Sequence, residues 1–374
     1  MSGIAIGGTG VYVPPDTIDN AELLAPYNEY VRRHNAAHAT EIAAGKMEPL
    51  EESTEDFVLK ATGIRRRHVV TREGMLDPDI LCPRMPERPD DRLSLSAEMA
   101  VKAARIALER AGIEPRQLDG VICAASTMQR PYPQIAIEIQ DALGVEGFGF
   151  DMLTGCSSAT FALDVADSLI RGGQARAILC VNPEINTGHL NLRDRETHFI
   201  FGDACAAAVL LPTEEAHGAN AWEIVSTRMK SVYSNNIRNN FGPLNRFDPS
   251  TAGAPDKLIT QKGRKVFKEV VPLGAEFILE HLAANGLRPA DLKRMWLHQA
   301  NINMNRLLAT KVLGHPPSPA EAPSILEEYG NTSSAGSVIA FDMHSADLKA
   351  GDLGLMCSFG AGYSAGSLIL RKLG

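Results

Sequence analysis

Short apolar runs bounded by glycine, proline and polar residues alternate along the chain with longer stretches whose apolar residues recur every three or four positions. Short apolar runs between turn signals are typical of buried β-strands, and a spacing of three and four is typical of amphipathic helices. In the first half the pattern predicts a helix over 95–112 and strands at Ile4–Gly8, Gly120–Ala125, Gly149–Leu153, Ala177–Val181 and Ala206–Leu211.

The second half of the chain repeats this design. The stretch 266–286 has helical spacing, and strands are predicted after it, at Met295–His298, Leu353–Ser358 and Gly366–Leu370. Strands that alternate with helices, given twice, predict an α/β fold of two mixed halves packed together in five layers. We place the halves at 1–214 and 215–374, because the polar stretch 212–222 separates the two patterns.

Three segments fall outside the repeated design. Residues 71–94 are rich in Pro, Asp and Arg and predict an irregular loop, and residues 234–253 are polar and loop-like. Long loops in compact folds are usually functional or mobile. Residues 20–57 are charged and helix-prone, with one apolar face formed by Leu23, Leu24, Tyr27, Tyr30 and Val31.

Composition and charge narrow the class of protein. The 374 residues are 44% hydrophobic and 22% charged, as in a soluble globular protein with a full core. The net charge of -8 argues against a nucleic-acid binder. No apolar run reaches the roughly 18 residues of a membrane span, and the first residues lack the pattern of a secretory signal. The six cysteines contain no C-x-x-C pair, which disfavours zinc and disulfides. We therefore expect a cytoplasmic protein without a metal.

The chain also repeats itself at the level of single residues. Residues 155–173 begin GCSSATFALD, and residues 330–351 begin GNTSSAGSVI. A constant offset aligns these segments and sets Cys156 opposite Asn331. The same offset aligns 111–123 with 285–298 to within a residue, which sets a second polar residue, His298, at the end of a predicted strand. A duplicated α/β unit thus carries a cysteine in one copy and a histidine and an asparagine in the other.

Cys156 follows a predicted strand and precedes a run with helical spacing, so we expect it at a helix N-terminus. Unpaired backbone N–H groups and the helix dipole favour a thiolate there. Its small neighbours Gly155, Ser157, Ser158 and Ala159 leave room for a substrate carbonyl against the backbone. This geometry suits a covalent thioester whose oxyanion is held by main-chain donors. A buried cysteine in a tightly packed helix start explains the same pattern equally well.

His298 ends one predicted strand and begins a second predicted helix, and Asn331 occupies the place that Cys156 holds in the first copy. Taken singly, His298 reads as a strand-end histidine and Asn331 as a helix cap. Pseudo-symmetry, however, directs both helix starts to the centre of the molecule. Found together at repeat-related positions, the three residues favour a site.

A cysteine with one histidine and one asparagine suits a particular reaction. The cysteine accepts an acyl group, and two neutral donors then stabilise the enolate that forms when a malonyl thioester loses carbon dioxide. A papain-like Cys–His–Asn protease is the rival, but it does not explain the duplication. The glycine-rich segment 357–372 lets a backbone N–H approach the reacting carbonyl, or is simply a tight hairpin turn.

Several motifs in combination resemble one family. They are GTGVYVPP near the start, TGIRRRH (62–68), Cys156, FGDACAA (201–207), HQAN (298–301), GNTSSA (330–335) and FGAG (359–362). Together they cover nearly the whole chain and resemble the β-ketoacyl-acyl carrier protein synthase III enzymes of the thiolase superfamily. The resemblance implies a thiolase-like αβαβα fold, with Cys156 as nucleophile and His298 and Asn331 as the decarboxylation pair.

The resemblance also implies roles for residues around the site. Ala361 would be the second oxyanion donor beside the backbone of Cys156, and Tyr132 would reach across a homodimer interface to the partner's acyl pocket. Phe267 would line the tunnel. The segment TGIRRRH contributes Arg65 to the residues expected to bind coenzyme A, which also include Arg195 and Phe57.

Two positions depart from the family's pattern for coenzyme A. Phe57 stands where short-chain enzymes have a tryptophan that stacks on the adenine, and Ala61 replaces a nearby arginine. Asn303 stands where a basic residue would help docking. The residues expected to meet an acidic carrier protein are Arg264, Lys265, Lys268, Gln299, Arg306 and Lys311.

Residues 20–57 and 71–94 are insertions relative to the acetyl-primed enzymes of the family. Together with the segments NNIRNNFG and NLRDRETHFIFGD they resemble a longer subgroup, the β-ketodecanoyl synthase type, which accepts medium-chain acyl groups. We expect a homodimer that takes acyl-coenzyme A and malonyl-acyl carrier protein and needs no other cofactor. Head-to-head acyl condensation or secondary metabolism is the alternative, and a carboxylate base near Cys156, from Glu184 or residues 20–57, would favour head-to-head condensation. A catalytically idle acyl-binding protein is the third hypothesis.

Overall fold

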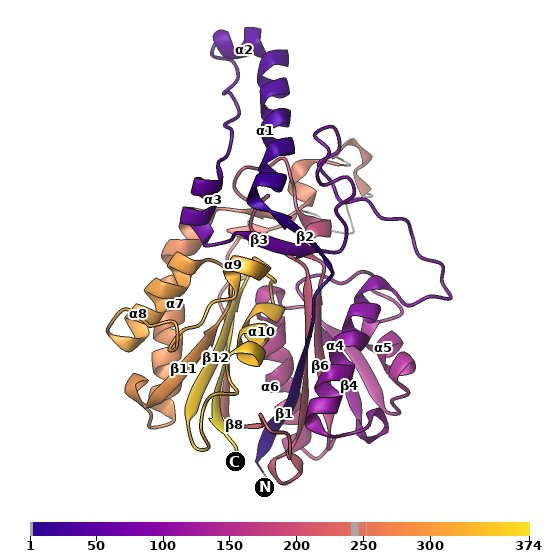
Figure 1. The fold of residues 1–374 in the computed structure, drawn as a ribbon, viewed down its shortest axis with the longest axis vertical. Coiled ribbons are helices and arrows are strands. Elements are labelled where there is room, and N and C mark those ends of the chain that lie inside the picture. Colours follow the sequence, from indigo (N-terminus) through magenta and orange to yellow (C-terminus); the bar gives the residue numbers. More distant parts are fainter. Residues whose placement is uncertain (1–2, 241–246, 252) are drawn as a thin grey trace.

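The computed structural model describes residues 3–240, 247–251 and 253–374 of the chain. One large sheet runs through the molecule (Figure 1), with strand order β11-β12-β13-β8-β1-β7-β6-β4-β5. In that order its strands are Leu292–Leu297, Leu353–Gly360, Ser364–Lys372, Trp222–Ser231, Ile4–Tyr12, Ala204–Pro212, Ile178–Glu184, Gly120–Ala124 and Phe148–Met152.

The two halves of the sheet join at one end only. β1 and β8 pair over Ile4–Ile6 and Trp222–Ile224, and beyond these residues the halves diverge. Helices α6 (Ser158–Arg171) and α10 (Ala335–Met343) contact strands of both halves and therefore fill the space between them. The sequence predicted two halves packed together, but the pattern did not predict the strand β8, through which the halves are also joined by hydrogen bonds.

The outer faces of the sheet are covered by helices from the matching half. α4 (Leu95–Ala111) and α5 (Ile135–Leu143) pack on the N-terminal strands, and α7 (Gly263–Ala284) and α8 (Ile302–Leu313) lie beside the C-terminal strands (Figure 1). The order from one side to the other is helix, sheet, helix, sheet, helix. The predicted five-layered α/β fold is confirmed.

Helix α4 has the local features that make a helix predictable from its sequence. The Ser94 hydroxyl accepts a hydrogen bond from the Ala97 N–H at 3.2 Å and caps the first turn. Gly112 has φ +70°, a left-handed conformation that ends the helix at little cost. The predicted apolar face is buried along its length, at Ala97, Val101, Ala104, Leu108 and Ala111.

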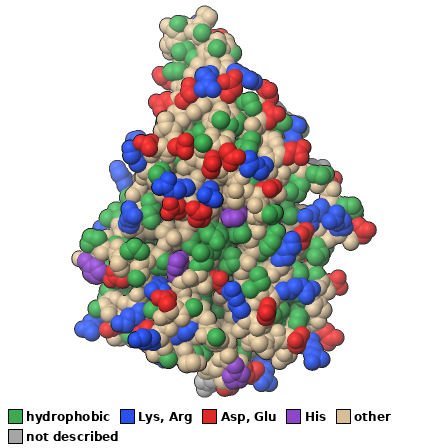
Figure 2. Space-filling view, viewed as in Figure 1, with side chains coloured by type: hydrophobic (Ala, Val, Ile, Leu, Met, Phe, Trp, Pro, Cys, Tyr) green, Lys and Arg blue, Asp and Glu red, His purple; other side chains and the backbone are tan. Residues whose placement is uncertain are grey.

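The insertion 20–57 forms a helical arm that projects from the body (Figure 1). It contains α1 (Asn20–Ala37) and α2 (Ala39–Ala43), and the chain then returns to α3 (Glu55–Thr62). On α1, Leu23, Leu24, Tyr27 and Val31 are buried as predicted, while Tyr30 is half-buried. Charged side chains of both signs cover much of the arm in the view of Figure 2. Its base rests on a small sheet of β2 (Asp16–Asp19) and β3 (Arg66–Val69).

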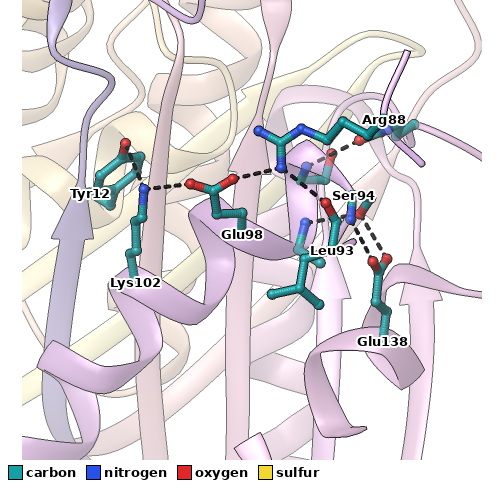
Figure 3. A network of polar contacts seen from close by, with 10 residues as sticks. Tyr12, Arg88, Leu93, Ser94, Glu98, Lys102 and Glu138 are labelled. Carbon is teal, nitrogen blue, oxygen red and sulfur yellow. Dashed lines mark hydrogen bonds and ion pairs between the residues drawn. The ribbon is translucent and has the colours of Figure 1, made fainter. Parts of the chain in front are cut away.

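The insertion 71–94 contains no helix or strand, as predicted. Its end is fixed by polar contacts to α4 and its neighbours (Figure 3). Arg88 donates to Glu98 at 2.6 Å, and Lys102 donates to the other oxygen of Glu98 at 2.7 Å. Ser94 bonds Glu138 of α5 through both its N–H, at 2.5 Å, and its hydroxyl, at 2.7 Å. The loop is therefore anchored where it enters the helix.

The segment predicted as a loop at 234–253 lies partly outside the described residues. Its described part includes β9 (Ile237–Arg238), which pairs with β10 (Thr260–Gln261), and is otherwise without regular strands. The short α9 (Leu326–Tyr329) leads to Asn331. Among the helices of the described residues, none is long and apolar enough to cross a membrane.

Candidate active site

A cavity of about 470 Å³ lies between α3, the N-terminal part of α7 and the loops that carry Cys156, His298 and Asn331. Cys156, His298 and Asn331, which are far apart in the sequence, all line it. Most of the remaining wall is apolar, including Phe57, Phe199, Phe201, Val266, Phe267 and Phe359. The fold thus brings the three predicted residues to one largely apolar chamber that suits a thioester substrate.

Cys156 lies in a single 3-10 turn, Gly155–Ser157, that leads into α6, as predicted. Gly155 has φ +61°, so the chain turns sharply between β5 and this turn. Ser157 and Ser158 bind the turn to its surroundings through their hydroxyls. Ser157 pairs with the Ser364 hydroxyl at 2.6 Å, and Ser158 donates to the Ala125 carbonyl at 2.9 Å. The nucleophile candidate is therefore held by both halves of the molecule.

The glycine-rich turn after β12 packs directly against this cysteine. A Cβ atom on Gly360 would lie 3.0 Å from the backbone nitrogen of Cys156 and 3.0 Å from that of Ser157. The backbone nitrogen of Ala361 lies 3.3 Å from the point where a Cβ of Gly155 would sit. Only a residue without a side chain permits this approach. The turn therefore places the backbone of Ala361 beside Cys156, where the predicted oxyanion donor belongs.

His298 is buried and follows β11 directly, with its N–H donating to the Cys357 carbonyl at 2.7 Å. The sequence predicted that His298 begins the next helix, but α8 begins only at Ile302. Asn301 caps α8 instead, because its side chain accepts from the backbone of Asn303 and Met304. The imidazole is thus presented by a short connection between strand and helix.

Asn331 is fixed by its own backbone. It forms an isolated bridge with Phe201, and its N–H donates to the Ile200 carbonyl at 2.9 Å. Its side-chain oxygen accepts from the N–H of Ser333 at 2.9 Å. Since the oxygen is occupied, the amide NH₂ is the group left to donate into the cavity.

Burial sets the charge state of the pair. It raises the pKa of the Cys156 thiol to about 11, helped by the negative charge of Glu184 and opposed by contact with the Ser333 hydroxyl. It lowers the pKa of His298 to about 4, opposed by contact with the Ser333 backbone. The Ser333 hydroxyl and the His298 Nδ1 are buried, and neither makes a well-formed hydrogen bond within the described residues. Burial therefore favours a neutral thiol and a neutral imidazole, and it opposes the thiolate that the helix start predicts.

We expect the alkylation of Cys156 by iodoacetamide to accelerate about tenfold per pH unit between pH 7 and 9, because only the thiolate reacts and its pKa lies above this range. The rate is measured by mass spectrometry of the Cys156 peptide, with circular dichroism as the control for an intact fold. A plateau below pH 8 would show that the helix start ionises the thiol after all.

The residues expected to bind coenzyme A lie at the cavity, but with altered contacts. Phe57 and Ala61 line the wall. The Arg195 guanidinium stacks over the Phe57 ring, 4.5 Å from its centroid, and forms an ion pair with Glu51 of the arm at 3.3 Å. Phe57 also meets Phe199 edge to face. Arg195 is thus already engaged by the arm.

Two residues predicted around the site do not line this cavity. Arg65 forms an ion pair with Glu327 at 2.6 Å and points elsewhere. Tyr132 is 80% exposed and borders a separate hollow beside Arg88 and Glu138. Such exposure is what a residue that acts in a partner subunit would show, but this role stays a prediction.

Of the residues predicted to meet the carrier protein, some line the cavity and others do not. Lys268 and Arg264 line the cavity, and Phe267 lies between them in the same wall, as expected for a tunnel residue. Lys265, Arg306 and Lys311 are exposed but do not line it. Gln299 contradicts the prediction. It is fully buried, with its amide nitrogen donating to the Leu297 carbonyl and its oxygen accepting from the Ile325 N–H, so it cannot meet a partner.

No carboxylate of the arm reaches the reacting residues. Within the described part of the chain, the one acidic residue that lines the cavity is Glu196, which is exposed and outside the arm. Glu184 is fully buried behind Cys156 and does not line the cavity. The base that head-to-head condensation would need is therefore not provided by the candidates that we considered.

No role was predicted for Ser333, Asn301 or Phe359, although all three help to build the site. All three stand in quoted motifs, Asn301 in HQAN, Ser333 in GNTSSA and Phe359 in FGAG, so those motifs are the signal that could have marked them. Asn301 fixes α3 to α8 by donating to the Ala61 carbonyl at 2.5 Å. That contact joins residues too distant in the sequence to be foreseen.

Comparison with known proteins gives matches over the whole chain. Models of 3-oxoacyl-[acyl-carrier-protein] synthase III and of its C-terminal part match residues 150–231 and 282–372. A β-ketodecanoyl-[acyl-carrier-protein] synthase of Pseudomonas aeruginosa is 56% identical over 346 residues, which are 92% of this chain and 99% of that protein. A β-ketoacyl-[acyl-carrier-protein] synthase III of Allorhizobium ampelinum is 34% identical, over 87% and 93% of the two chains.

Solved structures agree with this result. The crystal structure of 3-oxoacyl-[acyl-carrier-protein] synthase III from Aquifex aeolicus matches with a TM-score of 0.75 and 27% identity, over 99% of this chain and 100% of that one. Fold and relatives together define an acyltransferase, a condensing enzyme of the thiolase-like fold. The chain belongs to the 3-oxoacyl-[acyl-carrier-protein] synthase III family. The resemblance predicted from its motifs is confirmed, and the idle acyl-binding protein is excluded as a class.

Proposed function

We propose that the protein transfers a medium-chain acyl group from acyl-coenzyme A to Cys156 and condenses it with malonyl-acyl carrier protein, giving a β-ketoacyl-acyl carrier protein for fatty acid synthesis. The observation that carries this proposal is the meeting of Cys156, His298 and Asn331 in one largely apolar cavity. The 56% identical relative is named for a β-ketodecanoyl product, which supports the medium chain length.

The first half-reaction loads the enzyme. The Cys156 sulfur attacks the thioester carbonyl, the bond to the coenzyme A sulfur breaks, and the thiol proton passes to the leaving thiolate. Because the thiol is neutral at rest, the proton must leave as the sulfur attacks. The backbone N–H groups of Cys156 and Ala361, which the glycine-rich turn brings close together, hold the oxyanion.

The second half-reaction uses the neutral imidazole. The carboxylate of the malonyl thioester leaves as carbon dioxide, and the electron pair moves into the thioester carbonyl to form an enolate. His298, neutral across the physiological range, and the amide NH₂ of Asn331 donate to the enolate oxygen. The enolate carbon then attacks the acyl group on Cys156, and the cysteine sulfur leaves. No strong base is needed, since decarboxylation supplies the carbanion.

The surface residues support a carrier-protein partner and a homodimer, and the free cysteines support a cytoplasmic location. Lys268 and Arg264 at the cavity place positive charge where an acidic carrier protein would deliver its malonyl group. The exposed Tyr132 supports a homodimer. Six free cysteines fit a reducing compartment, the cytoplasm.

Chain length is the decisive test of the proposal. Condensation adds two carbons, so a ten-carbon product requires an eight-carbon acyl donor. We expect octanoyl-coenzyme A to acylate Cys156 at least about tenfold faster than acetyl-coenzyme A, because each buried methylene adds roughly 0.8 kcal/mol of favourable transfer. Intact-protein mass spectrometry after exposure to a mixed pool of acyl-coenzyme A esters measures this. A strong preference for acetyl groups would reject the medium-chain assignment.

A further inference from the structure

Glu184 is a buried carboxylate for which the reaction described above has no use. It is the last residue of β6 and is fully buried. Its Oε1 accepts hydrogen bonds from the backbone N–H of Ser126 at 2.9 Å, from the N–H of Ser334 at 3.1 Å and from the Ser334 hydroxyl. Its Oε2 accepts from the Ser126 hydroxyl at 2.5 Å. Four donors thus converge on one side chain.

These donors come from different halves of the molecule. Ser126 follows β4 in the N-terminal half, and Ser334 immediately precedes α10 in the C-terminal half. The carboxylate is therefore a fixed point between the two halves, beneath the cavity. Burying a carboxylate is unfavourable, and burial raises the pKa of Glu184 to about 7 although four donors bind its oxygens. Within the described part of the chain no ion pair compensates this buried group, so the arrangement calls for a specific use.

Ser334 ends the loop of residues 331–334, which begins with Asn331. Its neighbour Ser333 has φ +50°, a left-handed conformation that is unfavourable for a residue other than glycine and persists only when the surroundings impose it. The backbone of Ser333 donates to the side chain of Asn331 and contacts His298, and its hydroxyl contacts Cys156. The conformation of this one residue therefore helps to orient Asn331 and His298, and it brings the Ser333 hydroxyl against Cys156.

The loop is held at both ends. At its start, the backbone of Asn331 donates to the Ile200 carbonyl at 2.9 Å and accepts from the Gly202 N–H at 3.1 Å. At its end, the two donors of Ser334 are bound by Glu184. Without the carboxylate, the second attachment is lost and Ser333 can relax to an ordinary conformation, which turns the Asn331 amide away from the enolate.

We propose that Glu184 is a positioning residue for decarboxylation, which holds Ser334 and thereby keeps Ser333 in the turn that aims Asn331 and His298 at the malonyl group. The inference rests on the proposed function, since it concerns the second half-reaction. Because the turn that carries Cys156 is held by the bond between Ser157 and Ser364, loading of the acyl group depends far less on this loop.

The test measures the two half-reactions separately. In Glu184→Ala, we expect the kcat for decarboxylation of malonyl-acyl carrier protein to fall about 100-fold, as for a misplaced catalytic group, with an unchanged KM. Acylation of Cys156 by octanoyl-coenzyme A, followed by intact mass, should change less than about threefold. Glu184→Gln keeps an acceptor for both N–H groups, so it should recover most of the lost kcat.

Further variants keep the inference falsifiable if Glu184→Ala does not fold. Ser334→Ala should lower the decarboxylation kcat in the same way, and adding Glu184→Gln to it should lower the kcat little further, because the amide oxygen still accepts from the Ser334 N–H. Asp167→Asn, which neutralises another buried carboxylate, one paired with Arg171, is the matched control and should leave the ratio of the two half-reactions unchanged.

The outcomes are distinct. Equal losses in both half-reactions, in step with a lower melting temperature, would assign Glu184 to general stability and overturn the inference. Wild-type decarboxylation in the variants would overturn it as well. Absence of decarboxylation in the wild-type enzyme would instead refute the proposed function.

Discussion

Replacing Cys156 by serine is expected to lower condensation by at least about a thousandfold and to abolish the mass shift that acyl-coenzyme A produces. A serine hydroxyl is a much weaker nucleophile than a thiol unless a base activates it, and a histidine with a pKa of about 4 is a poor base for that purpose. The half-reactions separate here too. Cys156→Ser should still decarboxylate malonyl-acyl carrier protein, because His298 and Asn331 are untouched.

The matched control for this prediction is Cys82→Ser. Cys82 is an exposed free cysteine of the 71–94 loop and lies outside the cavity. The variant should therefore acylate and condense at the wild-type rate. Acylation of Cys156→Ser at a normal rate, or loss of acylation in Cys82→Ser, would assign the nucleophile to another thiol.

Replacing Asn331 by aspartate is expected to lower decarboxylation by about 100- to 1,000-fold, the typical loss of one donor to a developing oxyanion. The change is nearly isosteric. An aspartate oxygen can still accept from the Ser333 N–H, so the loop keeps its contact, but the side chain has no N–H to offer the enolate. Acylation of Cys156 should remain within a few-fold of the wild-type rate.

Asn285→Asp controls for the added charge. Asn285 is exposed at the end of α7, where its side chain donates to the His281 carbonyl. Both half-reactions should be unchanged in this variant. Released carbon dioxide and the acylated mass, followed in parallel, distinguish the two variants, and normal decarboxylation by Asn331→Asp would remove this residue from the mechanism.

The parts of the fold that were predictable are those with local causes. α4 could be predicted closely because a serine cap, an apolar face and a left-handed glycine all lie within one segment. β8 was missed because most of it is only half-buried, and its pattern therefore merges with the polar stretch before it. The joined sheet depends on β8, so it could not be foreseen either.

The same distinction applies to the site. Cys156, His298 and Asn331 were found because a repeat in the sequence marks two of them and a strand end marks the third. The prediction that Gln299 meets a carrier protein is wrong because its amide satisfies two buried backbone groups, a contact that no local pattern shows. Ser333 and Glu184 acquire their roles only through contacts between the halves, which no local pattern encodes.

The paired ends of the sheet have a practical consequence. Ile4 and Leu370 both pair with Ile224 of β8, one from each side. The start of the first strand therefore lies two strand spacings, about 10 Å, from the end of the last strand. The arm and α3 lie at the opposite end of the strands (Figure 1). A fluorophore, an affinity handle or a tether to a sensor surface attached near either terminus therefore leaves the substrate entrance unobstructed.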